Sequence, residues 1–176
     1  MNIITQSIPF FVVPVLNHAE VKQSILDSIA TMGIHSKIEL PIESISNTDW
    51  HLSPEVKRPY SNIIKPIFRT ALTEVERVLK PCKPLMFSNF WFQQYNHGDS
   101  HDWHFHGGSL ISAVYYLELN GESPKTTYRC MGQEFTIEAN EGDILFAPGY
   151  FEHKSKKNTG DRKTVVVCNF RPDDNY

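Results

Sequence analysis

The sequence lacks any uninterrupted apolar run of about 18 residues, so it predicts no membrane-spanning helix. Its start, residues 1–4, carries no basic residue and leads into no long apolar segment, which predicts no signal peptide. Cysteine is scarce: Cys82, Cys130 and Cys168 are odd in number and follow neither a disulfide nor a metal-binding spacing. Together these absences predict reduced thiols in a cytoplasmic protein.

An excess of positive charge is also missing. The chain has 17 lysine and arginine residues against 20 aspartate and glutamate residues, for a net charge of -3. An acidic surface does not attract nucleic acid or an anionic membrane, so neither is an expected partner. The expected partner is a small molecule, a peptide or a protein, and the sequence indicates no oligomeric state.

Several catalytic motifs are absent as well. There is no Gly-x-Ser-x-Gly elbow, phosphate-binding loop, Cys-x-x-Cys pair or Rossmann fingerprint. Serine hydrolysis, nucleotide-dependent chemistry and thiol redox chemistry therefore have no support in the sequence.

The composition is that of a globular protein, with 40% hydrophobic and 21% charged residues in 176 residues. This length predicts a single domain over residues 1–176, with enough chain to bury a core. Aromatic residues make up 12% of the chain, which suits a β-rich core around a pocket.

The first part of the chain, to about residue 84, predicts a helical layer. Residues 8–16 form an apolar β-type run whose two prolines would place it at a sheet edge. Asn17 and Glu20 have the spacing of a capping box, and Gly33 would stop the helix that follows. The apolar stripe of this helix comprises Val21, Ile25, Ile29 and Met32.

A second helix is predicted more strongly. Residues 35–58 have no periodicity and predict a long loop, whereas residues 63–79 keep helical spacing of apolar side chains for four turns. Pro66 suggests that the regular helix begins near that residue, and Pro81 ends it.

After Pro84 the pattern changes to short strands separated by turn residues. The expected strands are residues 86–95, 110–119, 126–130, 133–138, 143–147 and 163–170. Helices followed by many short strands predict an α+β fold with helices packed on a β-sandwich.

Histidines mark the candidate site. Four of the eight histidines lie within residues 97–106, and a strand would turn His104 and His106 to the same side. Two neighbouring imidazoles are half of a metal site, and His153 is the candidate for a distant third ligand. Ten residues beyond it, Lys163 opens an apolar strand.

This order, His104-x-His106, a distant His153 and then a cation on the next strand, resembles the Fe(II)/2-oxoglutarate-dependent oxygenases. The short prolyl-hydroxylase-like members from bacteria and tailed phages are the most similar, and the resemblance covers nearly the whole chain. It implies a double-stranded β-helix (jelly-roll) core over about residues 85–176, with the N-terminal helices packed on its major sheet.

The resemblance also implies the chemistry. The chain would bind Fe(II), 2-oxoglutarate and O2, with ascorbate as an optional accessory reductant, and would hydroxylate a peptidyl (prolyl-type) or small-molecule substrate. No catalytic residue beyond the metal centre is expected.

One departure concerns the metal ligands, because His106 stands where most relatives have aspartate. A second assignment is Asp102, His104 and His153, since Asp102 and His104 also share a strand face. We favour His104, His106 and His153, because His104 then aligns with the first histidine of the family. Three histidines are also the ligands of zinc hydrolytic sites and of some iron dioxygenases.

The distant carboxylate of 2-oxoglutarate needs a buried cation. Lys163 and Arg162 are the two candidates on the strand after His153, and Lys163 is favoured because it shares strand parity with Asn169, which resembles the terminal asparagine of the family. If neither binds a carboxylate, both belong to a basic rim with three nearby lysines, Lys154, Lys156 and Lys157.

Further cosubstrate residues follow from the resemblance. Tyr116 would donate a hydrogen bond to the same carboxylate, and Tyr95 would line the pocket. Ser112 shares a strand face with Tyr116, which favours a pocket position over a core position. Ser112 and Asn169 complete the expected set of cosubstrate-binding residues.

Two other functions fit the same residues. One is a three-histidine, cupin-type metal dioxygenase that does not use 2-oxoglutarate. The other is a non-catalytic jelly-roll protein whose histidines bind metal for structure. Neither needs a buried cation ten residues past His153.

Overall fold

The structure is a computed structural model, and it describes residues 7–32, 37–40, 43–120 and 122–175. Its largest element is an antiparallel sheet of six strands in the order β1-β10-β7-β12-β5-β4. The strands are β1 (Phe11–Pro14), β4 (Asn47–Thr48), β5 (Leu85–Asn96), β7 (Ile111–Glu118), β10 (Asp143–Pro148) and β12 (Arg162–Pro172). The proline-containing β1 lies at an edge of this sheet, as the sequence predicts.

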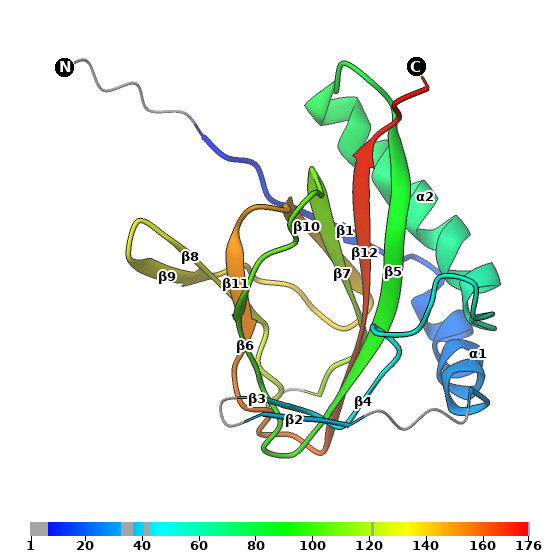
Figure 1. Cartoon of the computed structure of the whole chain (residues 1–176), viewed down its shortest axis with the longest axis vertical. Coiled ribbons are helices and arrows are strands. Elements are labelled where there is room, and N and C mark those ends of the chain that lie inside the picture. The colour runs from blue at the N-terminus through cyan, green and yellow to red at the C-terminus, as the bar shows by residue number, and fades with distance from the viewer. Residues whose placement is uncertain (1–6, 33–36, 41–42, 121, 176) are drawn as a thin grey trace.

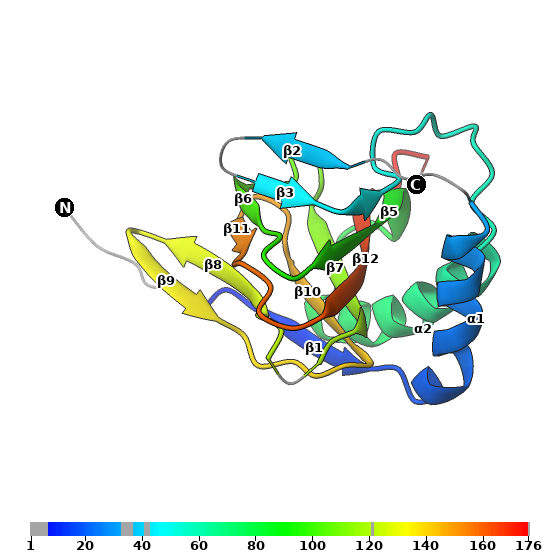
Figure 2. The ribbon, with the colours of Figure 1, turned by 90° about the horizontal axis from the view of Figure 1, so that it is seen from below.

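A second sheet of four strands faces the first (Figure 1). Its strands are β6 (His101–His104), β8 (Thr126–Cys130), β9 (Gln133–Thr136) and β11 (Glu152–Ser155), in the order β6-β11-β8-β9. A small hairpin of β2 (Ile38–Leu40) and β3 (Glu43–Ile45) lies across the end of the two sheets beside β6 (Figure 2).

Alternation along β12 divides the interior into two cores. Val166, Cys168 and Phe170 face the helices, whereas Val165 and Val167 face the smaller sheet. Between the sheets these valines pack with Val114, Tyr116, Tyr128 and Leu145. The site-bearing residues Lys163 and Asn169 have the same parity as Val165 and Val167, so the strand turns them to the inner side.

Two helices cover the outer face of the larger sheet, as predicted (Figure 1). They are α1 (His18–Ala30) and α2 (Ser61–Leu79), and α2 buries Ile64, Phe68 and Leu72 against the sheet. No helix in the described part of the chain is long and apolar enough to cross a membrane. The three cysteines are unpaired thiols.

The predictions for the helix ends need correction. Asn17 precedes α1, but its side chain makes no capping hydrogen bond. The ring of His18 bonds the Tyr115 hydroxyl instead, with 2.7 Å between Nδ1 and the oxygen, which ties the first turn to the sheet. Helix α2 begins at Ser61 and continues through Pro66, because a proline there removes only one helical hydrogen bond while Ile64 and its neighbours are buried. The predicted stop at Gly33 lies outside the described residues.

The prediction of a structureless loop over residues 35–58 is also wrong, because the strands β2, β3 and β4 lie within it. Strands of only two or three residues are too short to give a detectable periodicity. Asp99 holds the hairpin in place: its carboxylate accepts hydrogen bonds from the Ser44 hydroxyl at 2.6 Å, from the Ser46 hydroxyl, and from the Asn96 amide at 2.8 Å.

A buried ion pair fixes the segment that follows. Asp49 is fully buried, and its carboxylate accepts hydrogen bonds from Arg58 Nε at 2.7 Å, from the Tyr60 hydroxyl at 2.6 Å and from the Phe92 amide at 2.8 Å. These bonds tie the residues between β4 and α2 to β5, and they fix the backbone next to Trp50.

Replacing Asp49 with alanine should therefore lower the free energy of unfolding by about 3–5 kcal/mol, because it leaves the Arg58 charge and two donors buried without their acceptor. Urea denaturation followed by circular dichroism measures this loss. Glu55→Ala, an exposed change in the same segment, should stay within about 0.5 kcal/mol of the wild type. A loss in Asp49→Ala no larger than that of the control would mean that the network does not stabilise the fold.

Candidate metal centre and adjoining cavity

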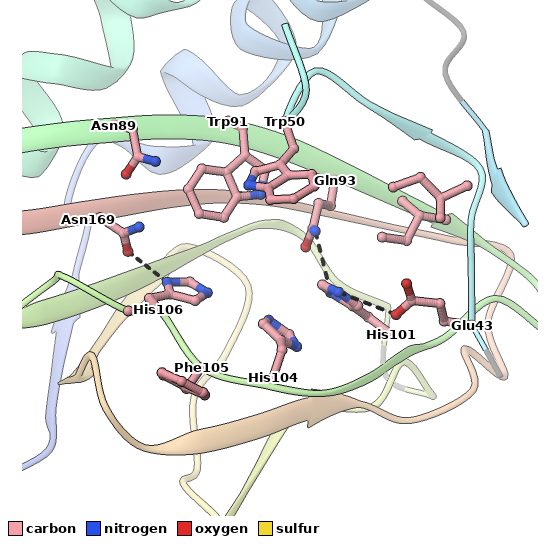
Figure 3. Close-up of a pocket in the computed structure, with 13 residues that line it drawn as sticks. Glu43, Trp50, Asn89, Trp91, Gln93, His101, His104, Phe105, His106 and Asn169 are labelled. Carbon is pink, nitrogen blue, oxygen red and sulfur yellow. Dashed lines mark hydrogen bonds and ion pairs between the residues drawn. The ribbon is translucent and has the colours of Figure 1, made fainter. Parts of the chain in front are cut away.

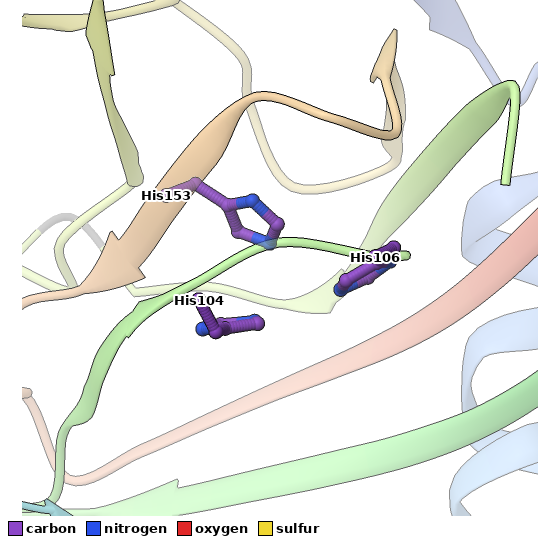
Figure 4. A group of neighbouring side chains, drawn as sticks. All are labelled: His104, His106 and His153. Carbon is purple, nitrogen blue, oxygen red and sulfur yellow. The ribbon is translucent and has the colours of Figure 1, made fainter. Parts of the chain in front are cut away.

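Three histidines converge between the two sheets (Figure 4). His104 ends β6, His106 lies two residues later, and His153 lies on β11 directly opposite His104 in the strand register. The ligand atoms that the three offer all lie within 4.8 Å of one another. His106 and His153 are buried, and His104 is partly buried. The sequence-predicted set is thus brought together in one place.

The outer ring nitrogens of all three imidazoles have oxygen partners. His104 Nδ1 is 2.7 Å from the Asp102 carbonyl oxygen, and His153 Nδ1 is 3.0 Å from the Phe151 carbonyl oxygen. A carbonyl oxygen can only accept, so each Nδ1 carries a proton and donates it. Each Nε2 then carries a lone pair, which is the form that binds a metal.

His106 has side-chain partners in place of a carbonyl. Its Nδ1 lies 2.7 Å from Asn169 Oδ1 and 2.6 Å from Ser112 Oγ. The sequence predicted that Ser112 and Asn169 would serve the cosubstrate, whereas the structure places both against a histidine. Strand parity had placed them correctly on the inner face, but it could not identify their neighbour.

Burial keeps these imidazoles neutral. Loss of hydration lowers the pKa of His153 well below its usual value and lowers the pKa of His106 to about 4. The pKa of His104 is lowered by the same cause. Neutral imidazole is the form that a metal requires, so the site is ready for a metal at neutral pH.

The alternative ligand Asp102 is not part of this group of ligand atoms. Its backbone carbonyl accepts from His104, and its backbone amide donates to Glu43 Oε2 at 3.2 Å. No carboxylate joins the three histidines among the described residues. Three neutral imidazoles fit Fe(II), and they equally suit zinc, copper or nickel.

Removing the side-chain amide that orients His106 should weaken metal binding by the three histidines. Asn169→Ala should lower the metal affinity of the apo-protein by about 10- to 100-fold, because partners of the outer nitrogen fix the ring and raise its basicity. Titration with Fe(II) or Zn(II) against a competing chelator measures this change. Asn89→Ala is the matched control, because Asn89 pairs with Asn169 across β5 and β12 but is not bonded to His106. Equal affinities in the two variants would contradict the orienting role.

Lys163 is almost completely buried, and it lines a small cavity together with the three histidines. Its ammonium donates to the Pro124 carbonyl at 2.6 Å and to Ser155 Oγ at 3.0 Å, and it lies 5.4 Å from the centre of the Tyr95 ring. No carboxylate pairs with it among the described residues. Burial lowers the pKa of this lysine to about 7.

Arg162 points away from the site. Its side chain is about half exposed and binds the Glu118 carboxylate through two hydrogen bonds of 2.7 and 2.9 Å. It lines neither of the two cavities beside the histidines. Of the two candidate cations, the structure places only Lys163 at the site, because adjacent strand residues face opposite sides.

The two predicted tyrosines are buried with their hydroxyls already bonded. Tyr116 donates to Thr126 Oγ1 at 2.9 Å and accepts from the Thr126 amide at 3.1 Å. Tyr95 donates to Gln93 Oε1 at 2.7 Å. Tyr95 lines the small cavity next to Lys163, and Tyr116 does not. The role predicted for the Tyr116 hydroxyl therefore requires it to exchange its bond with Thr126.

Two cavities adjoin the histidines and share part of their lining, including His104 and His106. The inner cavity, between the histidines and Lys163, measures about 30 Å³, and the outer cavity measures about 350 Å³. Figure 3 shows the residues of the outer cavity. The outer cavity is lined by Ile38, Glu43, Ile45, Trp50, Asn89, Trp91, Gln93, His101, His104, Phe105, His106, Gly107 and Asn169. Glu43 and Trp50 were not predicted as site residues, because both lie in the segment that was predicted as a loop.

His101 is a fourth histidine at the site. Its ring stacks on that of His104 with 3.8 Å between ring centres, and Gln93 and Glu43 flank it (Figure 3). Burial lowers the pKa of His101 to about 3. It therefore forms a neutral wall of the outer cavity next to a candidate metal ligand.

No family model matches this sequence, and no curated protein matches it either. Solved structures do match. A 2OG-Fe(II) oxygenase family oxidoreductase from Burkholderia pseudomallei is 9% identical, with a TM-score of 0.69 over 92% of this chain and 83% of that chain. A Pseudomonas putida prolyl-4-hydroxylase is 14% identical, with a TM-score of 0.66 over 95% and 94%. The non-haem α-ketoglutarate-dependent epimerase SnoN from nogalamycin biosynthesis is 11% identical, with a TM-score of 0.70 over 94% and 77%. The chain therefore shares the fold of solved 2OG-Fe(II) oxygenases.

Proposed function

We propose that this chain is a non-haem Fe(II)- and 2-oxoglutarate-dependent oxygenase, with residues 1–176 as one domain. In this proposal the two facing sheets wind as a double-stranded β-helix, and the helical layer of about residues 1–84 supports the larger sheet. His104, His106 and His153 are the metal ligands, and Lys163 holds the distant carboxylate of 2-oxoglutarate.

The observation that carries the proposal is a buried lysine without an acidic partner, next to three histidines whose ligand atoms converge. Among the residues that the structure describes, Lys163 bonds neutral oxygens alone, those of Pro124 and Ser155. Burying a cation without a counter-ion is costly, and proteins retain such groups where they bind a charged ligand. A dicarboxylate that chelates a metal with one end and reaches a cation with the other matches this arrangement.

When bound, the iron and 2-oxoglutarate would supply the redox chemistry, in which O2, cosubstrate and a substrate C–H group give succinate, CO2 and a hydroxylated product. The protein residues hold and orient these groups. The Asp102 and Phe151 carbonyls and the Asn169 amide keep each Nε2 turned inward. The buried walls formed by Trp91, Val165 and their neighbours exclude water from the reacting groups.

Binding of 2-oxoglutarate requires side chains to move. The inner cavity of about 30 Å³ holds about one water molecule. The ammonium of Lys163 would exchange its bonds to Pro124 and Ser155 for bonds to the carboxylate. This exchange is favourable, because bonds between two charged groups are stronger than bonds to neutral oxygens.

The reaction type is the finer part of the proposal. We propose hydroxylation of a peptidyl (prolyl-type) or small-molecule substrate, by analogy with structures such as the prolyl-4-hydroxylase. The same fold also carries the epimerase SnoN. Fold alone does not select between these reactions.

A second candidate is a three-histidine metal dioxygenase that does not use 2-oxoglutarate. Two observations favour it: no carboxylate of the described residues joins His104, His106 and His153, and the inner cavity is small in this structure. In that case the substrate itself would bind the metal from the larger outer cavity, and Lys163 would be dispensable.

An anaerobic titration of the apo-protein with Fe(II) and then 2-oxoglutarate tests the proposal. The expected result is a visible iron-to-cosubstrate charge-transfer band, followed by succinate when O2 is admitted. Binding of Fe(II) without a band on addition of 2-oxoglutarate would overturn the proposal in favour of the second candidate. Arg162→Ala is the control variant and should give the wild-type band, because Arg162 lies outside both cavities.

A further inference from the structure

Glu43 is the one charged side chain that is not a histidine among the described residues lining the outer cavity. Its side chain is 16% exposed, and no lysine or arginine in the described part of the chain forms an ion pair with it. Oε2 accepts one hydrogen bond, from the Asp102 amide at 3.2 Å, and lies 3.5 Å from His101 Nε2, which is long for a hydrogen bond. The carboxylate is therefore buried with little compensation.

Other partly buried glutamates of the chain differ in this respect. Glu118 is 21% exposed and binds Arg162, and Glu141 is 32% exposed and binds Lys22. Glu43 is more buried than either, yet among the described residues no lysine or arginine binds it. Since removing a carboxylate from water is unfavourable without a counter-ion, the counter-ion of Glu43 is expected to come from a ligand.

The rest of the cavity suits a cation. Trp50, Trp91 and Phe105 form aromatic walls, and Trp50 and Phe105 are 57% and 59% exposed at its opening (Figure 3). The faces of aromatic rings attract ammonium and guanidinium groups. The amide of Gln93, on the other side of His101, adds a polar group to the cavity lining without introducing a competing positive charge.

The position of Glu43 is fixed before any ligand binds. Ser44, the next residue, donates its hydroxyl to Asp99 and exchanges two backbone hydrogen bonds of 2.9 Å with Ser100. Ser46 donates to the same Asp99 carboxylate. A carboxylate held in place in this way loses little conformational freedom when a cation binds.

Glu43 is also close to the metal ligands. It contacts His101, and the ring of His101 stacks on His104 at 3.8 Å. A cation bound at Glu43 would therefore be separated from the candidate metal ligand His104 by the ring of His101. Carbon atoms attached to that cation would extend along the histidines toward the metal centre.

From these observations we infer that the outer cavity binds a substrate bearing an alkylammonium or guanidinium group, with Glu43 as its counter-ion and the aromatic walls around it. This inference names the substrate class of the proposed oxygenase and rests on the proposed function for its chemistry. The binding step itself requires only the cavity.

The test uses two capped amino acids that differ in charge. N-acetyl-L-lysine amide carries an ammonium group, and N-acetyl-L-norleucine amide has nearly the same shape without it. Each is titrated into the full-length apo-protein and into the anaerobic complex with Fe(II) and 2-oxoglutarate, with calorimetry and tryptophan fluorescence as readouts. Free L-lysine, titrated in parallel, distinguishes a free amino acid from a peptide side chain as the source of the cation.

The lysine probe should bind at least tenfold more tightly than the norleucine probe. Glu43→Gln, which keeps the shape and removes the charge, should abolish that preference. Glu39→Gln is the matched control, because Glu39 is an exposed glutamate on the same hairpin and pairs with Lys37. Thermal unfolding of each variant verifies that the hairpin remains folded.

Equal affinity of the wild type for both probes, or an unchanged preference in Glu43→Gln, would overturn the inference. This failure is distinct from failure of the proposed function. A charge-transfer band with 2-oxoglutarate but no lysine preference removes only the substrate class. A Glu43-dependent lysine preference without the band retains cation binding and removes the cosubstrate.

Discussion

Replacing His153 with alanine is expected to abolish stoichiometric Fe(II) binding at micromolar protein concentration. His153 is the ligand that comes from a distant strand, and the Phe151 carbonyl orients its ring. Four-ligand zinc sites gain about 10–16 kcal/mol from the metal, so one ligand contributes roughly 3 kcal/mol or about a hundredfold in affinity. With only two imidazoles left and no carboxylate in the group, Fe(II) would lose its facial set of ligands.

The measurement is anaerobic equilibrium dialysis with iron quantified in both compartments. His97→Ala is the control, because His97 is an exposed histidine of the same cluster in sequence and lies outside the group of ligand atoms. His106→Ala should behave like His153→Ala, whereas Asp102→Asn should retain the metal. One bound iron per chain in His153→Ala would remove His153 from the set of ligands, and loss of iron in Asp102→Asn would restore Asp102 as a candidate.

The sequence predicts much of the fold because its longer elements have strong periodicity. The helix predicted over residues 63–79 and the six strands predicted after Pro84 follow from periodicity and turn residues, and they differ from the structure by a few residues at their ends. The strands β6 and β11 were not among the predicted strands. All four residues of β11 (Glu152–Ser155) are charged or polar, and β6 (His101–His104) has a single apolar residue, so neither carries an apolar pattern. The pairing of β11 with β6 nevertheless places His153 opposite His104.

The candidate site is only partly readable from the sequence. Parity places Lys163, Ser112 and Asn169 on the inner face, and the structure agrees. Parity does not tell which group each side chain contacts, and so Ser112 and Asn169 were assigned to the cosubstrate rather than to His106. The bond from His106 to Asn169 joins residues 63 positions apart, and the bond to Ser112 crosses the turn that precedes β7. Neither contact has a signal in the sequence.

Glu43 and Trp50 illustrate the same limit. Both lie in a segment without periodicity, and long-range hydrogen bonds place them over the cavity. Asp99 binds Ser44 and Ser46, and Asp49, within the segment, binds the Phe92 amide of β5. In the sequence, a glutamate in a polar stretch looks the same whether it lies at the surface or lines a cavity. The charge of the outer cavity therefore emerges only from the folded structure.

Replacing Lys163 with methionine is expected to weaken 2-oxoglutarate binding by about 2–4 kcal/mol, or roughly 30- to 1,000-fold, because the distant carboxylate loses its charged partner. Methionine preserves most of the length and packing of the side chain, so the cavity keeps its shape. Lys163→Ala should show a similar loss. The affinity is measured from the amplitude of the charge-transfer band as 2-oxoglutarate is added to the Fe(II) complex.

Arg162→Ala provides the control for this measurement. Its guanidinium binds Glu118 at the surface, so the affinity for 2-oxoglutarate should stay within about twofold of the wild type. Loss of affinity in Arg162→Ala with none in Lys163→Met would contradict the assignment of Lys163. An unchanged affinity in both variants would leave the three-histidine dioxygenase without 2-oxoglutarate as the better explanation.

The lowered pKa of Lys163 also predicts how stability depends on pH. Burial lowers its pKa from 10.5 to about 7, so between these values the folded apo-protein binds fewer protons than the unfolded chain does. The free energy of unfolding should therefore rise with pH over that range, by up to about 1.4 kcal/mol per pH unit, and this rise should be absent in Lys163→Met. Chemical denaturation at several pH values compares the two.

Deprotonation of Lys163 should raise the stability of the apo-protein but weaken its binding of 2-oxoglutarate. A dicarboxylate binds the ammonium form of Lys163, and above pH 7 that form must first regain its proton. The dissociation constant of 2-oxoglutarate should therefore increase with pH above about 7, approaching tenfold per pH unit, whereas in Lys163→Met it should be weak at every pH without this slope. A wild-type affinity that does not change between pH 7 and pH 9 would mean that the lysine does not bind the carboxylate. Stability that rises with pH while affinity falls is a combination that a surface lysine of ordinary pKa would not produce, because such a lysine stays charged over this range.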